Sequence, residues 1–200
     1  MTTAQGLAVL AAAEGTGPRL EPGDLSLALA GAELVDLVGL RAVLLHAGRV
    51  LPAASPRIKD AVLFEAASGI VREPPYETVE QWLWRRGRDL AARYWRALQA
   101  ATADGAPAGS SRHPFRRPRP LTAAPAGGRG VDRRGDGPPV LAALAAAARI
   151  AEATDETLAE LDPDEAAVVG AVHQAITQLA AERHRRSLGG AGFGTVPRGF

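Results

Sequence analysis

The sequence predicts a mainly α-helical protein: a compact helical domain around a central buried helix at about residues 24–40, with a small β-hairpin and a disordered basic insert. Three observations support this fold class. Residues 24–40 are apolar around most of a helical circumference, which is typical of a helix in the middle of a bundle. Other segments repeat apolar residues at helical spacing behind capping residues. Between residues 105 and 139 that periodic pattern is lost.

The chain has 200 residues and no cysteine, a length that supports one domain with its own core. We therefore expect a single domain over residues 1–200. The absence of cysteine excludes disulfides, thiolate nucleophiles and cysteine-ligated zinc, and it is compatible with a cytoplasmic location.

The start of the chain lacks the positive region of a secretory signal. Charged residues interrupt every apolar run before the ~18 residues of a membrane span, so we expect a protein that can lie on a membrane without crossing it.

Two helices are expected in the first forty residues. Residues 3–13 form a short alanine- and leucine-rich helix that glycines end. Asp24 can cap a second helix that reaches about Leu40. Its few polar residues fall close together on a helical wheel; they are Ser26, Glu33 and Asp36. Full burial of one large aliphatic side chain contributes about 1.5–3 kcal/mol, so this helix can supply much of the hydrophobic stabilisation.

A hairpin and a helix are expected next. Residues 42–51 contain two short apolar runs around a turn at Gly48, which predicts a β-hairpin. Pro52 and Pro56 end the hairpin, and residues 58–68 have the pattern of a helix.

The stretch from Trp82 to Arg88 combines two of the three tryptophans with three arginines. Thr78 and Gln81 precede it with the spacing of a capping box, which predicts a helix over residues 78–87. An indole beside guanidinium groups suits a surface that meets an anionic ligand with an apolar side, such as a lipid headgroup or a phosphorylated partner. The alternative is a tryptophan anchored in the core beside solvated arginines.

Residues 88–103 continue or restart this helix, with an apolar stripe at Leu90, Tyr94 and Leu98 that is typical of a core face. Residues 105–139 then form a low-complexity insert rich in glycine, proline and arginine. This insert has seven arginines and two aspartates, so it is basic. With few large apolar residues it cannot bury enough surface to offset its ordering entropy, and we expect it to be disordered.

The helical pattern returns near the C-terminus. Residues 140–153 are expected to be helical, and Thr154 or Asp155 can cap a short helix after them. Residues 162–165 read Asp-Pro-Asp-Glu, which combines a cap, a proline in the first turn and acids at the positive end of the helix dipole. The last helix is expected to end before a glycine-rich tail at residues 188–200.

No motif for catalysis or metal binding is found in the sequence. Its histidines do not have the spacing of metal ligands; they are His46, His113, His173 and His184. The glycines at 189–194 do not follow a strand and open a helix, as a dinucleotide site requires. There is no Gly-x-Ser-x-Gly, and helix capping accounts for the clustered acids. We expect no enzyme activity, no catalytic residue, no metal and no cofactor.

Two segments resemble the bacterial branch of the Golgi phosphoprotein 3 family. They are RLEPGDLSLALAGAELVDL, from Arg19, and EPPYETVEQWL, from Glu73, with the hairpin between them and the arginine-rich helix after them. Residues 137–153 and the closing GFGTVPRGF, from Gly192, are also similar to this branch. The resemblance implies a helical domain around one buried helix and peripheral membrane association. Eukaryotic members bind phosphatidylinositol 4-phosphate on Golgi membranes and act as adaptors in glycosyltransferase sorting.

The resemblance also implies a headgroup pocket made of a tryptophan, an arginine in the buried helix and an Arg-x-x-Arg pair. Arg85 and Arg88 match the pair in one register, whereas in the other register Arg88 is followed by Ala91. The place of the tryptophan, near Glu21, holds no aromatic residue, and the arginine of the buried helix falls at about Ala30. General anionic-lipid binding is therefore implied more strongly than this one phosphoinositide.

We therefore expect a non-enzymatic peripheral membrane protein on the cytoplasmic face of a membrane. It would bind anionic phospholipid headgroups of the phosphatidylinositol 4-phosphate type at a basic helix surface. The predicted headgroup-binding residues are Arg85, Arg86, Arg88 and Arg93, with Trp84 as the membrane-interface anchor.

A second hypothesis is a protein–protein adaptor without direct lipid contact, which recruits acidic partners through residues 112–134. Self-association is a further expectation, because the family places an arginine-rich strand pair used for insertion or self-association within residues 105–136. Nucleic-acid binding through the same segment is disfavoured, since the segment lacks interleaved aromatic residues and a recognition helix.

Overall fold

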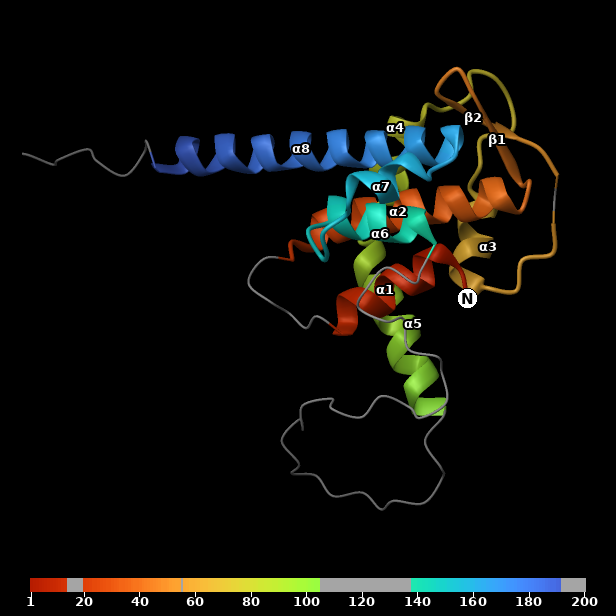
Figure 1. Ribbon diagram of the computed structural model, residues 1–200, viewed down its shortest axis with the longest axis horizontal. Helices are drawn as coiled ribbons and strands as arrows, with labels where there is room; N and C mark the ends of the chain where they lie inside the picture. The colour runs from red at the N-terminus through yellow and green to blue at the C-terminus, as the bar shows by residue number, and fades with distance from the viewer. Residues whose placement is uncertain (14–19, 55, 105–137, 192–200) are drawn as a thin grey trace, which may run out of the picture.

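The computed structural model describes residues 1–13, 20–54, 56–104 and 138–191 (Figure 1). Within these residues the chain forms eight helices and one two-stranded sheet, which confirms the mainly helical fold class. The elements are α1 (Thr3–Ala13), α2 (Pro22–Gly39), β1 (Val43–His46), β2 (Arg49–Pro52), α3 (Ala61–Ser68), α4 (Val79–Arg86), α5 (Leu90–Asp104), α6 (Pro139–Ala147), α7 (Asp155–Ala159) and α8 (Pro163–Ala191). Most of the predicted insert and tail lies outside the described residues, including the adaptor segment 112–134.

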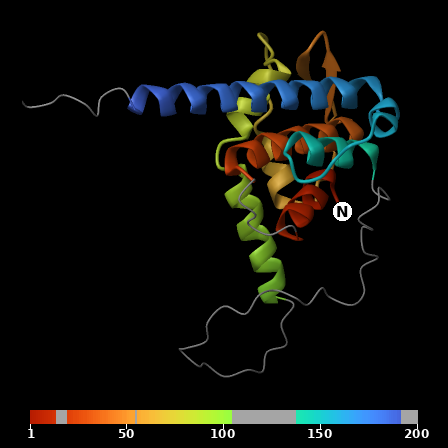
Figure 2. The same ribbon diagram turned by 60° about the vertical axis from the view of Figure 1, so that its left-hand side comes forward.

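Helix α2 is the centre of the domain, as its sequence predicts. Every residue from Asp24 to Leu34 is buried, and Leu37 is buried one turn later. Helices α1, α4, α5, α6 and α8 all pack against α2. Two views of the molecule agree that α2 lies between α8 and α1 (Figures 1 and 2). The core therefore surrounds a single helix.

The start of α2 differs from the prediction that Asp24 caps it. The helix begins two residues earlier, at Pro22, with Glu21 at the N-cap position. Proline suits the first turn of a helix because its fixed φ is helical and its missing N–H would be unpaired there anyway. Asp24 instead lies in the first turn, is buried, and accepts a hydrogen bond from Arg183 Nη1 of α8 at 2.8 Å.

Two polar residues of α2 cap other helices. Ser26 Oγ accepts a hydrogen bond from the backbone N–H of Ala91, in the first turn of α5, at 3.1 Å. Asp36 accepts from the backbone N–H groups of Thr3 and Ala4, at the start of α1, at 2.8 and 3.1 Å. These side chains satisfy N–H groups that have no partner within their own helices.

The predicted hairpin is present. Strands β1 and β2 pair antiparallel, with Val43 opposite Pro52 and His46 opposite Arg49. Ala47 and Gly48 form the turn with φ of 49° and 72°, the left-handed pair that a tight hairpin turn requires. Val50 N–H donates to Glu77 O at 2.9 Å, so the hairpin holds the segment that leads into α4.

Capping residues set most of the other helix starts. The Thr78–Gln81 capping box is formed, with hydrogen bonds of 2.9 and 3.1 Å, so α4 begins where predicted. Thr154, rather than Asp155, caps α7. Asp162 and Glu165 cap each other's backbone N–H groups at the start of α8.

Three other helix boundaries differ from the prediction by three residues or more. Helix α3 starts at Ala61, after its cap Asp60, and not at residue 58. Helix α6 ends at Ala147, six residues early, before Arg149 at φ 60°. Helix α8 continues to Ala191, past the residue at which the tail was expected to begin. No helix in the described part of the chain is both long and apolar enough to cross a bilayer.

Helices α2 and α8 approach closely at Gly31. A Cβ at this position would lie 2.4 Å from Val172 Cγ2, well inside van der Waals contact. The absence of a side chain at Gly31 therefore allows the two helix backbones to come together.

We expect Gly31→Ala to lower the free energy of unfolding by about 1–3 kcal/mol, because the added methyl overpacks the contact with Val172. Gly39→Ala is the matched control, since nothing lies within 4 Å of a Cβ there. It should change stability by less than about 1 kcal/mol, in the stabilising direction. Urea denaturation followed by far-UV circular dichroism measures both. Equal effects at the two positions would contradict the close approach of α2 and α8.

Candidate functional site

The two tryptophans of α4 belong to the core or lie against it. Trp82 is fully buried, and its Nε1 donates a hydrogen bond to Ala30 O of α2 at 3.1 Å. Trp84 is half-buried and packs against the core. The core-anchor interpretation therefore holds for Trp82, while the role of Trp84 at a membrane interface stays a prediction.

Arg86 lies in the interior, although it was predicted to bind headgroups at the surface. Its side chain is only 6% exposed. Its Nε and Nη2 donate to the two carboxylate oxygens of Glu33 at 2.7 and 3.0 Å. Nη2 also donates to Val62 O at 2.8 Å, and Nη1 lies 3.3 Å from Glu65 Oε1. Arg86 follows Trp82 by four residues and so lies on the same, inward face of α4.

Glu33 is the buried partner of this arginine. Burial raises the pKa of the Glu33 carboxyl, and the opposing effect of Arg86 is smaller. Tyr94 of α5 donates its hydroxyl proton to Glu33 Oε1 at 3.1 Å. Burial, and then the nearby Glu33 carboxylate, raise the pKa of the Tyr94 hydroxyl, so Tyr94 remains a donor. Two hydrogen bonds from the Arg86 guanidinium and a third from Tyr94 offset the hydration that the Glu33 carboxylate loses on burial.

Arg85 lies at the edge of the surface. Its Nε and Nη2 donate to the Glu77 carboxylate at 3.0 and 2.6 Å. The guanidinium carbon lies 5.1 Å from the centre of the Trp82 ring, a cation–π distance. The Arg85 side chain is 43% exposed. Arg85 is thus held in one orientation with part of its guanidinium accessible.

The remaining predicted arginines are at the surface. Arg88, between α4 and α5, is exposed and makes no ion pair with any described residue. Arg93 forms a hydrogen-bonded ion pair with Glu65 of α3, and this hydrogen bond is the main cause that lowers the pKa of Glu65. Arg93, Glu65 and Arg96 line an open hollow of about 410 Å³. Arg85 and Arg88 do not line this hollow.

Arg96 is a surface residue that was not among the predicted headgroup-binding arginines. It follows Arg93 by three residues on α5, the spacing that puts two side chains on the same helix face, and this spacing was the available signal.

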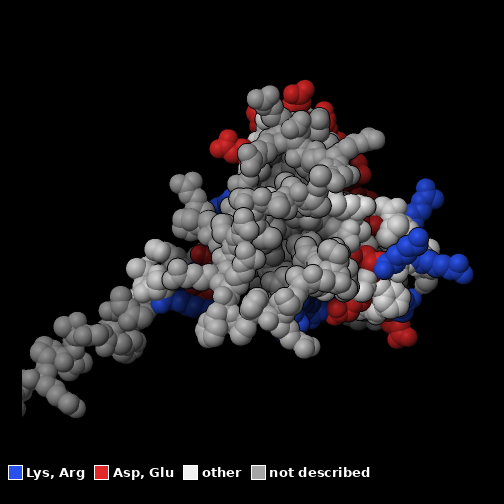
Figure 3. Space-filling model, turned by 90° about the horizontal axis from the view of Figure 1, so that it is seen from below, with Lys and Arg blue, Asp and Glu red and all other residues white. Residues whose placement is uncertain are grey.

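In a view from below, blue Lys and Arg side chains gather at the right-hand end, where α3 and the hairpin lie in Figure 1 (Figure 3).

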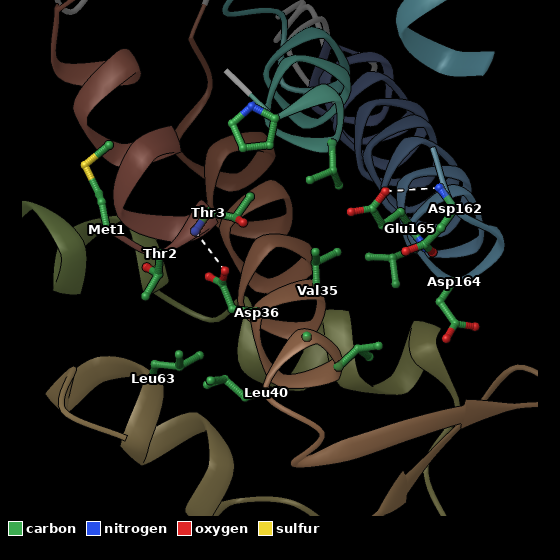
Figure 4. Close-up of a pocket in the computed structure, with 15 residues that line it drawn as sticks. Met1, Thr2, Thr3, Val35, Asp36, Leu40, Leu63, Asp162, Asp164 and Glu165 are labelled. Atoms are coloured by element: carbon green, nitrogen blue, oxygen red, sulfur yellow. Dashed lines mark hydrogen bonds between the residues drawn. The ribbon is translucent and has the colours of Figure 1, made fainter. Parts of the chain in front are cut away.

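A second large hollow, of about 420 Å³, lies among α1, α2, α6 and the start of α8 (Figure 4). Its walls are largely apolar, with carboxylates from Asp36, Asp162, Asp164 and Glu165. Four carboxylates repel a phosphate, so this hollow does not fit an anionic headgroup. No group of three or more His, Asp or Glu residues in the described segments could hold a metal ion.

We expect Arg86→Met to lower the free energy of unfolding by about 3–5 kcal/mol, because Glu33 would lose its buried cation. The double variant Glu33→Gln, Arg86→Met should recover a large part of this loss. It removes both charges and leaves an amide oxygen to accept from Tyr94. Urea denaturation measures the series.

Arg88→Met is the control for this series, because the same substitution falls on an exposed arginine. We expect it to change stability by less than about 0.5 kcal/mol. If Arg86→Met cost no more than Arg88→Met, the buried ion pair would be contradicted.

One protein family matches this chain. The model of the family described as Golgi phosphoprotein 3 (GPP34) matches residues 4–188, from α1 to the last turns of α8. Neither the comparison with curated proteins nor that with solved structures found a match. The family match spans almost all of the helical domain that surrounds α2. The chain therefore belongs to the Golgi phosphoprotein 3 family.

Proposed function

We propose that this chain is a non-enzymatic peripheral membrane protein that binds anionic phospholipid headgroups through the arginines of α4 and α5. The observation that supports this most is the surface hollow of Arg93 and Arg96, with the unpaired Arg88 at the head of the same helix. Family membership is consistent with it. The protein would act on the cytoplasmic face of a membrane.

The arrangement of the arginines suits phosphate oxygens. Guanidinium groups bind phosphate through two parallel N–H donors, and each arginine near an anionic surface contributes about 1 kcal/mol. Glu65 accepts a hydrogen bond from Nη1 of Arg93, so a headgroup competes with Glu65 for this donor. Arg85 is preorganised by Glu77 and the Trp82 ring and would present its exposed edge.

The proposal differs from the sequence-based site in two residues, because Arg96 is added and Arg86 is removed. Arg86 is left out, because all three of its guanidinium nitrogens already contact Glu33, Val62 or Glu65. Trp84 is half-buried, so only part of its indole would reach the interface. Ala30 contributes no guanidinium to the buried helix, and we therefore propose a class of anionic headgroup, of the phosphatidylinositol 4-phosphate type, rather than one lipid.

We expect Arg88→Glu, Arg96→Glu to weaken binding to anionic vesicles by about 30-fold or more, since each lost arginine removes about 1 kcal/mol. Neither residue has an ion-pair partner in the described part of the chain, so folding should be retained. Co-sedimentation with phosphatidylcholine vesicles containing phosphatidylinositol 4-phosphate or phosphatidylserine measures the affinity. Added salt should weaken the wild-type binding, because exposed charges are screened.

The matched control is Arg185→Glu, Arg186→Glu, which makes the same change of charge on α8. This variant should bind vesicles almost as well as the wild type. Equal losses in the two variants would show a dependence on net charge alone and contradict the α4–α5 site.

We expect Glu65→Gln to strengthen binding to the same vesicles about fivefold, because it frees Arg93 and removes one negative charge. Glu182→Gln is the control, since Glu182 pairs with two arginines on α8 in a similar way. A gain only for Glu65→Gln supports competition between the carboxylate and a headgroup. No gain would contradict the role of Arg93.

A further inference from the structure

The outer face of α3 presents an exposed aromatic side chain. Phe64 is 58% exposed, and it is the only aromatic among the large exposed hydrophobic residues of the described chain. Pro56, Ile58 and Ile70 line a small hollow of about 80 Å³ together with Phe64. Val71, just after this helix, is also exposed. Ile70 belongs to the core and Ile58 packs against it, whereas Phe64 and Val71 lie outside the core.

Cationic side chains flank the same face. Arg72 lines the hollow beside Phe64, while Arg57 and Lys59 are exposed on either side of Ile58. Arg57, Lys59 and Arg72 form no ion pair with another described residue. In the view from below, the right-hand end of the molecule carries blue Lys and Arg side chains with red Asp and Glu side chains among them (Figure 3).

This face also adjoins the proposed headgroup site. Glu65, the residue after Phe64 on α3, is bonded to Arg93. Phe64 therefore lies between two sets of cations. One set comes from the segments before and after α3, and the other comes from α5. A protruding apolar group with cations on two sides is complementary to an anionic bilayer, where aromatic side chains settle at the headgroup level.

We infer that Phe64 is the membrane anchor of this protein and inserts into the interface of an anionic bilayer, with Arg57, Lys59 and Arg72 on the surrounding headgroups. The inference rests on the proposed function and adds to it an apolar contact between Phe64 and the bilayer. A bilayer fits better than a protein partner, because Phe64 protrudes and the hollow beside it is too small for more than one side chain.

The chain has no cysteine, so a single labelled cysteine reports on one position. Phe64→Cys, labelled with the environment-sensitive fluorophore NBD, is mixed with vesicles of phosphatidylcholine and phosphatidylserine. We expect a blue-shifted, several-fold brighter emission that spin-labelled lipids quench. Leu158→Cys on α7, with 46% exposure in the native chain, is the control and should show no change.

A second measurement uses loss of the side chain. Phe64→Ser should weaken vesicle binding about tenfold, while Leu158→Ser leaves it unchanged. Co-sedimentation with a silent label at position 64 overturns the inference and leaves the proposed function standing. A signal at both labelled positions also overturns it. No co-sedimentation at all rejects the function and the anchor together.

Discussion

The fold depends on the buried pair of Glu33 and Arg86. The guanidinium joins α4 to α2, and its further contacts with Val62 and Glu65 reach α3, while Tyr94 brings in α5. Four helices thus meet at one charged centre inside a largely apolar core. A buried charge is tolerated only where its partner is in place, so each residue of the pair constrains how these helices pack.

The same short helix supplies both the interior charge and the surface charge. Arg86 follows Trp82 by one helical turn and faces α2, whereas Arg85 is rotated away, bonds to the buried Glu77 and keeps part of its own side chain exposed. The ion pair of Arg86 fixes the rotation of α4. It thereby also fixes which arginines are left to the solvent. In this way the core determines the composition of the candidate lipid-binding surface.

Local signals in the sequence predicted the parts of the fold that local interactions decide. The Thr78 capping box and the Asp162 helix start both depend on residues within one turn of each other. The interior position of Arg86 could not be predicted in this way, because its partner lies 53 residues away in the chain. Glu33 in an almost wholly apolar helix was the one available sign of a buried cation. The exposure of Phe64 was likewise hidden, since an apolar residue in a helical pattern reads as core.

The capping contacts of α2 have a consequence for cooperativity. The first turns of α1 and α5 obtain side-chain acceptors from Asp36 and Ser26, which reach them only after these helices have docked on α2. Short helices are marginal in water on their own. Neither α1 nor α5 is therefore expected to stay helical on its own. The amide protons of both helices should exchange with solvent only when the whole domain opens.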